Sequence, residues 1–285
     1  MSKHLSILWA ILAAALYAVN APVSKLLLQE ATPTMMAAML YLGAGIGMLL
    51  LGMTRQQLKM GKNEQKLTRK DFPFAVGMIV LDIAAPICLM IGLRSTTSAN
   101  ASLLNNFEIV ATSVIALLVF KEAIGKRLWL AIGLITLSSA ILSMEDASSL
   151  HFSTGSLFVL LACICWGFEN NCTRMMSQSD PLEIVVLKGF GSGLGSLAIA
   201  FVVGEQLPPL RLILCALLLG FVSYGLSIFF YVYAQRKLGA AKTSAYYAIS
   251  PFIGVLLSLL IFQEMPSLSF WAGLLIMALG AYFAA

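Results

Sequence analysis

Ala99–Glu122, with the sequence ANASLLNNFEIVATSVIALLVFKE, decides the fold because it is apolar enough to cross a bilayer and occurs twice. The second copy, Ala241–Glu264, lies 142 positions later and reads AKTSAYYAISPFIGVLLSLLIFQE. The identical pairs at this offset are Arg94/Arg236, Ala99/Ala241, Ser102/Ser244, Leu117/Leu259, Leu118/Leu260, Phe120/Phe262, Glu122/Glu264 and Trp129/Trp271. An internal duplication in a membrane protein is typical of a repeat-built transporter, whose site lies where the repeats meet.

The composition is that of an integral membrane protein. The 285 residues are 60% hydrophobic and 11% charged, with a mean hydropathy of +0.91. Soluble domains are roughly half apolar and about a quarter charged. Since a span needs about 20 apolar residues, the length suffices for about ten spans and leaves no room for a soluble domain. The net charge of +5 is explained by cytoplasmic loops facing a lipid bilayer, and we expect no nucleic-acid partner.

Apolar runs bounded by charges and turn residues predict an all-α integral membrane protein with ten transmembrane helices. The first run continues to Leu28, which is too long for a signal-peptide core, so it is interpreted as an uncleaved span. The spans are expected at 5–28, 33–53, 72–93, 97–120, 124–144, 154–176, 181–203, 210–235, 240–262 and 267–285.

Basic residues in the loops predict the orientation. The one sizeable loop, Thr54–Asp71, carries a cluster of Lys and Arg and is expected to be cytoplasmic. Most other basic loop residues then also fall inside, whereas Lys25, Arg94 and Arg211 fall outside. Both termini are therefore expected to be cytoplasmic, and the protein is expected in the cytoplasmic membrane.

The duplication extends over the whole chain and predicts two repeats, residues 1–147 and 148–285. Asn20 of the first span matches Asn170 of the sixth. A unit of five spans is odd, so the second repeat is expected to be inverted in the membrane. Glycine triplets recur 148 positions apart and are interpreted as close helix contacts: Gly43, Gly45 and Gly47 match Gly191, Gly193 and Gly195.

Four ionisable residues lie deep within predicted spans. Asp82, Glu108 and Glu169 fall near the midplane, and Lys188 lies about 10 Å from the cytoplasmic end of its span at 1.5 Å per residue. An intramembrane charge costs about 2.5–3.5 kcal/mol, so each should face a cavity or a partner. The three acids are candidates for proton coupling. The alternative is a structural pair, such as Glu169 with Lys188, that holds helices in register.

Polar side chains share faces of two predicted spans. These faces carry Asn105, Glu108 and Thr112 in the fourth span, and Trp166, Glu169 and Thr173 in the sixth. They suit a polar metabolite, although hydrogen bonds between helices are the alternative. Asn20 and two tyrosines lie at comparable depth on the duplicated spans. The candidate substrate-binding residues are Asn20, Asn105, Glu108, Trp166, Glu169, Tyr246 and Tyr247.

Three prolines, Pro22, Pro86 and Pro251, lie inside predicted spans. Each lacks an N–H and frees the carbonyl four residues earlier. An exposed carbonyl in lipid is costly, so these bends are expected to line a cavity or to face neighbouring helices. Packing kinks without a function are the alternative.

Residues that would support catalysis are scarce. The two histidines, His4 and His151, fall at predicted membrane edges, and no phosphate-binding G-x-x-x-x-G-K motif occurs. The five cysteines lie inside apolar runs without a C-x-x-C pair and are interpreted as small apolar residues. We expect no metal, no cofactor and no enzymatic activity.

The two five-span halves, each with F-x-E before a span rich in Trp and Gly, resemble the EamA family of the drug/metabolite transporter superfamily. Asn20 with Lys25, and Trp166-Gly167, look like the starts of its two repeats, and Ser250-Pro251 is similar to its ninth-span pattern. The resemblance covers essentially the whole chain. It implies a ten-helix basket, with spans 1–4 and 6–9 around a central cavity. The fourth span departs from the ninth-span pattern because Ile109 replaces the proline, so the resemblance implies no role for Glu108.

The expected function is secondary transport of small polar metabolites, amino acids or related compounds, by alternating access, with export as the direction. The expected partner is a small-molecule substrate, and the expected unit is a monomer. One alternative is efflux of cationic, amphipathic drugs, which acids near the midplane and aromatic residues favour. A different class, a membrane-embedded enzyme acting on a lipid-linked substrate, would need a catalytic constellation facing one membrane surface.

Overall fold

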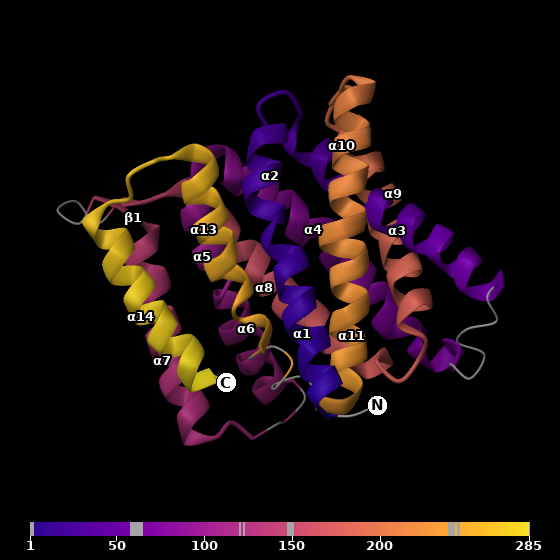
Figure 1. The fold of residues 1–285 in the computed structure, drawn as a ribbon, viewed down its shortest axis with the longest axis horizontal. Helices are drawn as coiled ribbons and strands as arrows, with labels where there is room; N and C mark the ends of the chain where they lie inside the picture. The colour runs from indigo at the N-terminus through magenta and orange to yellow at the C-terminus, as the bar shows by residue number, and fades with distance from the viewer. Residues whose placement is uncertain are drawn as a thin grey trace.

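The computed structural model describes residues 3–57, 65–119, 121, 123–146, 151–238, 243 and 246–284, and these are almost entirely helical (Figure 1). The helices of the first half are α1 (Lys3–Ala18), α2 (Asn20–Leu27), α3 (Pro33–Gln57), η1 (Arg69–Asp71), α4 (Phe72–Ser95), α5 (Ser98–Leu104), α6 (Phe107–Leu118) and α7 (Lys126–Ser143). Those of the second half are α8 (Thr154–Met176), α9 (Pro181–Val202), α10 (Leu210–Gly220), the π-helical turn η2 (Phe221–Leu226), α11 (Ser227–Leu238), α13 (Ser250–Phe262) and α14 (Leu268–Ala284).

Two short antiparallel strands lie where the halves join. β1 (Met144–Asp146) pairs with β2 (His151–Phe152), with Met144 opposite Phe152. β1 follows directly on α7, and β2 precedes α8.

Eight helical segments of the described chain are long and apolar enough to cross a membrane. They are His4–Leu27, Pro33–Arg55, Arg69–Ser95, Ser98–Leu118, Lys126–Ser143, Thr154–Met176, Pro181–Val202 and Leu210–Leu238. Two shorter apolar helices, α13 and α14, lie where the ninth and tenth spans are predicted. The predicted ninth span begins at residue 240, and part of its first half lies outside the described residues.

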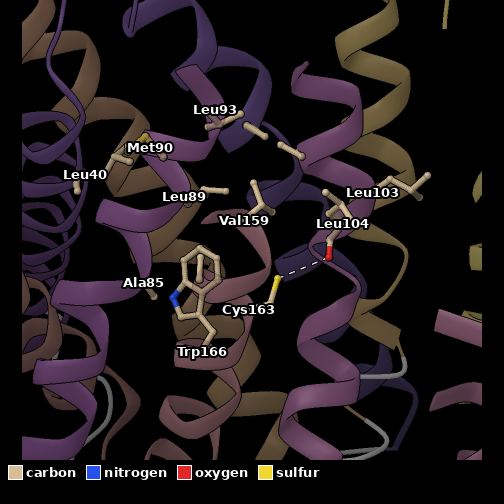
Figure 2. Close-up of a cluster of buried hydrophobic side chains, with 14 of the residues drawn as sticks. Leu40, Ala85, Leu89, Met90, Leu93, Leu103, Leu104, Val159, Cys163 and Trp166 are labelled. Carbon is tan, nitrogen blue, oxygen red and sulfur yellow. Dashed lines mark hydrogen bonds between the residues drawn. The ribbon is translucent and has the colours of Figure 1, made fainter. Parts of the chain in front are cut away.

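The predicted fourth span corresponds to the segment Ser98–Leu118, within which a turn at Asn105 and Asn106 separates α5 from α6. Here the backbone makes short-range bonds, from Asn106 N to Leu103 O (3.2 Å) and from Glu108 N to Asn105 O (3.1 Å). Such i→i+3 bonds tighten the chain and end the regular α-helical ladder. The thiol of Cys163 donates to the carbonyl oxygen of Leu104 at 3.6 Å (Figure 2).

The three prolines have different effects. Pro22 follows a break at Val19 that separates α1 from α2, whereas α4 continues unbroken through Pro86. Pro251 lies in the first turn of α13, directly after turn residues 248 and 249. Proline is tolerated in a first turn because its missing N–H would have no intrahelical partner there.

Helices that the duplication equates pack against each other. α3 contacts α9, α5 contacts α13, and α7 contacts α14. Two further large contacts, α4 with α8 and α11 with α1, are equivalent to each other under the duplication. α7 and α14 lie side by side at one edge of the molecule (Figure 1), whereas buried side chains of α3, α4, α5 and α8 form part of one hydrophobic core (Figure 2).

The glycine triplets are helix contacts, as predicted. A Cβ added to Gly189 would lie 2.4 Å from Gly45 N and 2.5 Å from Gly45 Cα, so the backbones of α3 and α9 touch at this point. One turn further along α9, a Cβ on Gly193 would lie 2.8 Å from Leu42 N. This close approach brings the side chains that follow on α3 and α9 to the centre of the bundle.

Gly189→Ala is expected to destabilise the protein by at least the roughly 1–3 kcal/mol typical of overpacking, because the opposing atoms are backbone and cannot rotate away. Thermal unfolding of the purified protein in detergent measures this loss. Gly133→Ala on α7 is the matched control, since no atom lies within 4 Å of its added Cβ. It is expected to gain stability, up to about 1 kcal/mol, from helix propensity. Equal melting temperatures for Gly189→Ala and the unchanged protein would contradict the α3–α9 contact.

Candidate functional site

A small cavity lies between the two halves and is lined almost entirely by aromatic, charged and amide side chains. Its lining residues are Tyr17, Tyr41, Glu108, Trp166, Glu169, Asn170, Thr173, Lys188, Tyr224, Ile228, Tyr231 and Tyr247. Its volume is about 50 Å³, which holds a few water molecules. Pockets that enclose a drug-sized ligand measure roughly 300–1,000 Å³. A whole metabolite therefore needs more space than this cavity provides, which requires the helices or rings to move.

A network of buried, oppositely charged side chains borders the cavity. Lys188 Nζ lies 3.1 Å from Asp82 Oδ2 and 2.9 Å from Glu169 Oε1. The Tyr41 hydroxyl donates to Asp82 Oδ1 at 2.6 Å, and the Thr173 hydroxyl donates to Glu169 Oε1. The pair of Glu169 with Lys188 is the one considered from the sequence, and Asp82 joins it from α4.

The network connects four helices of both halves. Asp82, Glu169 and Lys188 are 0%, 2% and 3% exposed, so water does not screen their charges. Two carboxylates share one ammonium group. Such buried ionic groups are compatible with a stable fold only while every partner is present. Removing one member leaves uncompensated charge in the bilayer core, which makes the network a strong constraint on how α3, α4, α8 and α9 are placed.

Glu108 has a different environment. Asn170 Nδ2 donates to Glu108 Oε1 at 2.6 Å and also lies 3.4 Å from Thr112 Oγ1. Within the described residues, no Lys, Arg or His nitrogen lies within ion-pair distance of the Glu108 carboxylate. Among the described residues, the Glu108 carboxylate is therefore hydrogen-bonded by an amide and is not paired with a cation.

Aromatic rings enclose the space next to Glu108. The Tyr17 ring centroid lies 6.3 Å from that of Trp166, and 5.8 Å from those of both Tyr224 and Tyr247. Tyr17 and Trp166 meet at an interplanar angle of 85°, the edge-to-face arrangement that the ring quadrupoles favour. The belt continues to Tyr231, whose ring centroid lies 5.1 Å from that of Tyr247.

The two asparagines that the duplication equates play parallel roles. Asn170 of the second half holds Glu108 of the first half. Reciprocally, Asn20 of the first half donates from Nδ2 to the Tyr224 hydroxyl of the second half at 3.2 Å, while Ser24 Oγ donates to Asn20 Oδ1 at 3.0 Å. Each amide thus fixes a cavity side chain that belongs to the other half.

The structure brings some of the predicted residues together and not others. Glu108, Trp166, Glu169 and Tyr247 line the cavity. Asn20 and Asp82 lie directly behind it, through Tyr224 and Lys188. Asn105 lies at the α5–α6 turn, with Oδ1 4.0 Å from Cys163 Sγ, and Tyr246 is half-buried; neither lines the cavity.

The predicted shared face of Asn105, Glu108 and Thr112 assumes a continuous helix, whereas a turn at Asn105–Asn106 lies between α5 and α6. Glu108 and Thr112, both within α6, do share a face, because Asn170 reaches both of them.

Sequence reasoning left Tyr41, Tyr224 and Tyr231 out of the site. The repeat offset of 142 could have identified Tyr224 as a candidate, because it equates Asp82 with Tyr224. It likewise equates Asn105 with Tyr247. At the offset of 148 that relates the glycine triplets, Tyr41 corresponds to Gly189, the glycine of the α3–α9 contact. Among the described residues, no group of three or more His, Cys, Asp or Glu could hold a metal ion.

The many long apolar helices, with a polar site to which both halves contribute, are those of a multi-pass membrane protein. Residues 4–144 and 153–285 match the EamA-like transporter family, and the chain belongs to this family.

A relative from Methanothermobacter thermautotrophicus, described as an uncharacterized transporter, is 26% identical over 264 residues, covering 87% of this chain and 76% of its own length. A solved structure, described only as a crystal structure of a protein, is similar with a TM-score of 0.74 at 15% identity, over 100% of this chain and 97% of that one. The solved structure supports the fold alone. The family and the relative indicate a transporter rather than an enzyme.

Lys188→Met is expected to lower the free energy of unfolding by about 3–5 kcal/mol, because it leaves Asp82 and Glu169 buried without a cation. Arg211→Met is the matched control: Arg211 and Glu30 also pair, at 3.0 Å, but their side chains are 73% and 55% exposed. Such a surface pair contributes roughly 0–1 kcal/mol. Denaturant or thermal unfolding in detergent distinguishes the two. Similar, small losses for both variants would mean that the buried network does not constrain the fold.

Proposed function

We propose that this protein is a secondary transporter that exports small polar metabolites, amino acids or related compounds, across the cytoplasmic membrane by alternating access. The observation that carries the proposal is the enclosed cavity to which both halves contribute charged, amide and aromatic side chains. In repeat-built transporters the substrate site lies at the repeat interface near the bilayer midplane, where helices are broken. The break between α5 and α6 lies beside this cavity, since Glu108 follows it directly.

The proposed architecture is ten spans in two inverted five-span repeats, with both termini in the cytoplasm. The reciprocal packing of α4 with α8 and of α11 with α1 supports a twofold relation between the halves. The start of α1 and the end of α14 lie toward the same side of the molecule (Figure 1), as an even number of spans requires. The basic loop that contains Lys66, Arg69 and Lys70 supports the cytoplasmic assignment of its side. One chain completes the site, so a monomer suffices.

Roles in the proposed site follow from the contacts. Glu108, Trp166, Glu169 and Tyr247 contact the substrate, and Asn20 supports the ring of Tyr224. Proton coupling is assigned to the three acids, with Glu108 as the foremost. Asp82 and Glu169 are already neutralised in part by Lys188, whereas Glu108 can exchange a proton without breaking an ion pair.

A contact between α5 and α13 closes the site toward the end of the bundle that is predicted to be external. Ser258 Oγ donates to Ser98 Oγ at 2.9 Å, and a Cβ added to Gly254 would lie 2.9 Å from Ser102 Oγ. Beyond this contact lies a second pocket of about 360 Å³, lined by the ends of α4, α5, α7, α13 and α14. Separation of α5 from α13 is the proposed step that releases substrate outward.

A substrate panel in reconstituted vesicles, with and without a pH gradient, tests the proposal. Transport of an amino acid or a related compound is expected, with a rate that depends on the gradient. Glu108→Gln is expected to abolish transport or its pH dependence while leaving the melting temperature nearly unchanged. Glu30→Gln, which removes an exposed acid outside the cavity, is the control and retains transport.

Three results count against parts of this account. Failure to transport any compound of the panel would overturn the proposed function. Unaltered, pH-dependent transport by Glu108→Gln would remove this residue from the mechanism. A loss of stability in Glu108→Gln that parallels the loss of transport would make Glu108 a helix tether rather than a substrate or proton site.

A further inference from the structure

The proposed function leaves open which chemical group of the substrate the cavity recognises, and the following inference rests on that function. We propose that the Glu108 carboxylate, held by Asn170 and surrounded by aromatic rings, binds the ammonium group of the transported compound. The substrates are then amine-bearing metabolites, and their ammonium group is what the site selects.

The first support is the charge of the site. Three carboxylates, those of Asp82, Glu108 and Glu169, lie in or directly behind the cavity, against the single ammonium group of Lys188. With all four ionised, the formal charge is −3 + 1 = −2. Charges interact strongly where water is excluded, so this excess favours a cationic ligand over an anionic one.

The second support is the position of Glu108 relative to Lys188. Lys188 is engaged by both other acids, at 3.1 Å and 2.9 Å, and is not in ion-pair contact with Glu108. Asn170 donates to Oε1 of Glu108, and an ionised carboxylate has about four lone-pair sites in all. Glu108 can therefore accept further N–H groups from a ligand without disturbing the network below it.

The third support is the group of aromatic rings that line the cavity. Tyr17 lies at its centre, in contact with Trp166, Tyr224 and Tyr247. A cation within about 6 Å of an aromatic ring face is attracted by the ring quadrupole, more strongly where it is desolvated. A carboxylate beside several rings thus combines the two interactions that stabilise an ammonium group.

The size of the cavity fits this role. About 50 Å³ accommodates a primary ammonium head and its first carbon but not a complete metabolite. We infer that the head binds at Glu108 and that the rest of the compound occupies space created when the rings or α5 and α13 separate. Asn170 is a positioning residue in this arrangement, because it acts on the ligand through Glu108.

Isothermal titration of the purified protein with n-butylammonium and n-butanol tests the inference, since the two probes differ in the –NH₃⁺ and –OH groups. The unchanged protein is expected to bind n-butylammonium at least ~10-fold more tightly, the equivalent of one close charge pair at moderate dielectric. Glu108→Gln is expected to abolish the difference, and Asn170→Leu to reduce it. Glu30→Gln, the exposed-acid control, is expected to retain it.

The ring contribution has its own pair of variants, which remains informative where Glu108→Gln does not fold. Tyr17→Leu removes the ring and is expected to weaken n-butylammonium binding roughly 3- to 30-fold. Tyr17→Phe keeps the ring and is expected to weaken it less. Equal losses for the two variants would show that the hydroxyl, not the ring face, matters, and would overturn the cation–ring part of the proposal.

Equal binding of n-butylammonium and n-butanol, or a preference that survives Glu108→Gln, would overturn the inference as a whole. Transport of a compound without an amine, unaffected by n-butylammonium, would overturn it while leaving the proposed transporter function intact. Absence of all transport in vesicles, together with Glu108-dependent binding of n-butylammonium, would overturn the proposed function instead.

Discussion

The ion network of Lys188 with Asp82 and Glu169 is the interaction on which the rest of the structure depends. All three side chains are at most 3% exposed, so the bilayer core tolerates their charges only while they converge. Convergence requires α4, α8 and α9 to approach closely, and the glycine contact between α3 and α9 permits it. The Tyr41 hydroxyl extends the network to α3. One electrostatic requirement thus fixes the relative placement of four helices that come from both halves of the chain.

This arrangement separates the structural acids from the one available for function. Lys188 neutralises part of the charge of Asp82 and Glu169, while Glu108 is held by the neutral amide of Asn170. Glu108 lies in the first turn of the short helix α6, after a turn that interrupts the backbone ladder. The helix opposite, α13, also begins near the centre of its predicted span, at Ser250. Short helices of this kind can move against the four-helix unit, which suits a site that must open to each side of the membrane in turn.

Much of the architecture could be predicted because burial in lipid imposes a simple pattern on sequence. Runs of apolar residues and a fixed offset between copies indicate spans and repeats, and the rarity of charges in lipid singles out Glu108, Glu169 and Lys188. The turn at Asn105–Asn106 could not be predicted from apolar periodicity, because no proline or glycine marks it. The role of Tyr41 could not be predicted either, since an aromatic residue in an apolar span cannot be told from a core residue until the partner of its hydroxyl is known. The small volume of the cavity depends on ring orientations, which a sequence does not specify.

The central claim is that the cavity between the halves is the transport site, and cysteine accessibility tests it most directly. In a background without the five native cysteines, single cysteines replace Ile228 in the cavity lining and Leu275 on α14. A small water-soluble thiol reagent should modify the cysteine at position 228, and transported substrate should slow that reaction. The cysteine at position 275 should stay unreactive with or without substrate. Substrate protection at position 275, with none at position 228, would place the transport pathway elsewhere in the bundle and contradict the account.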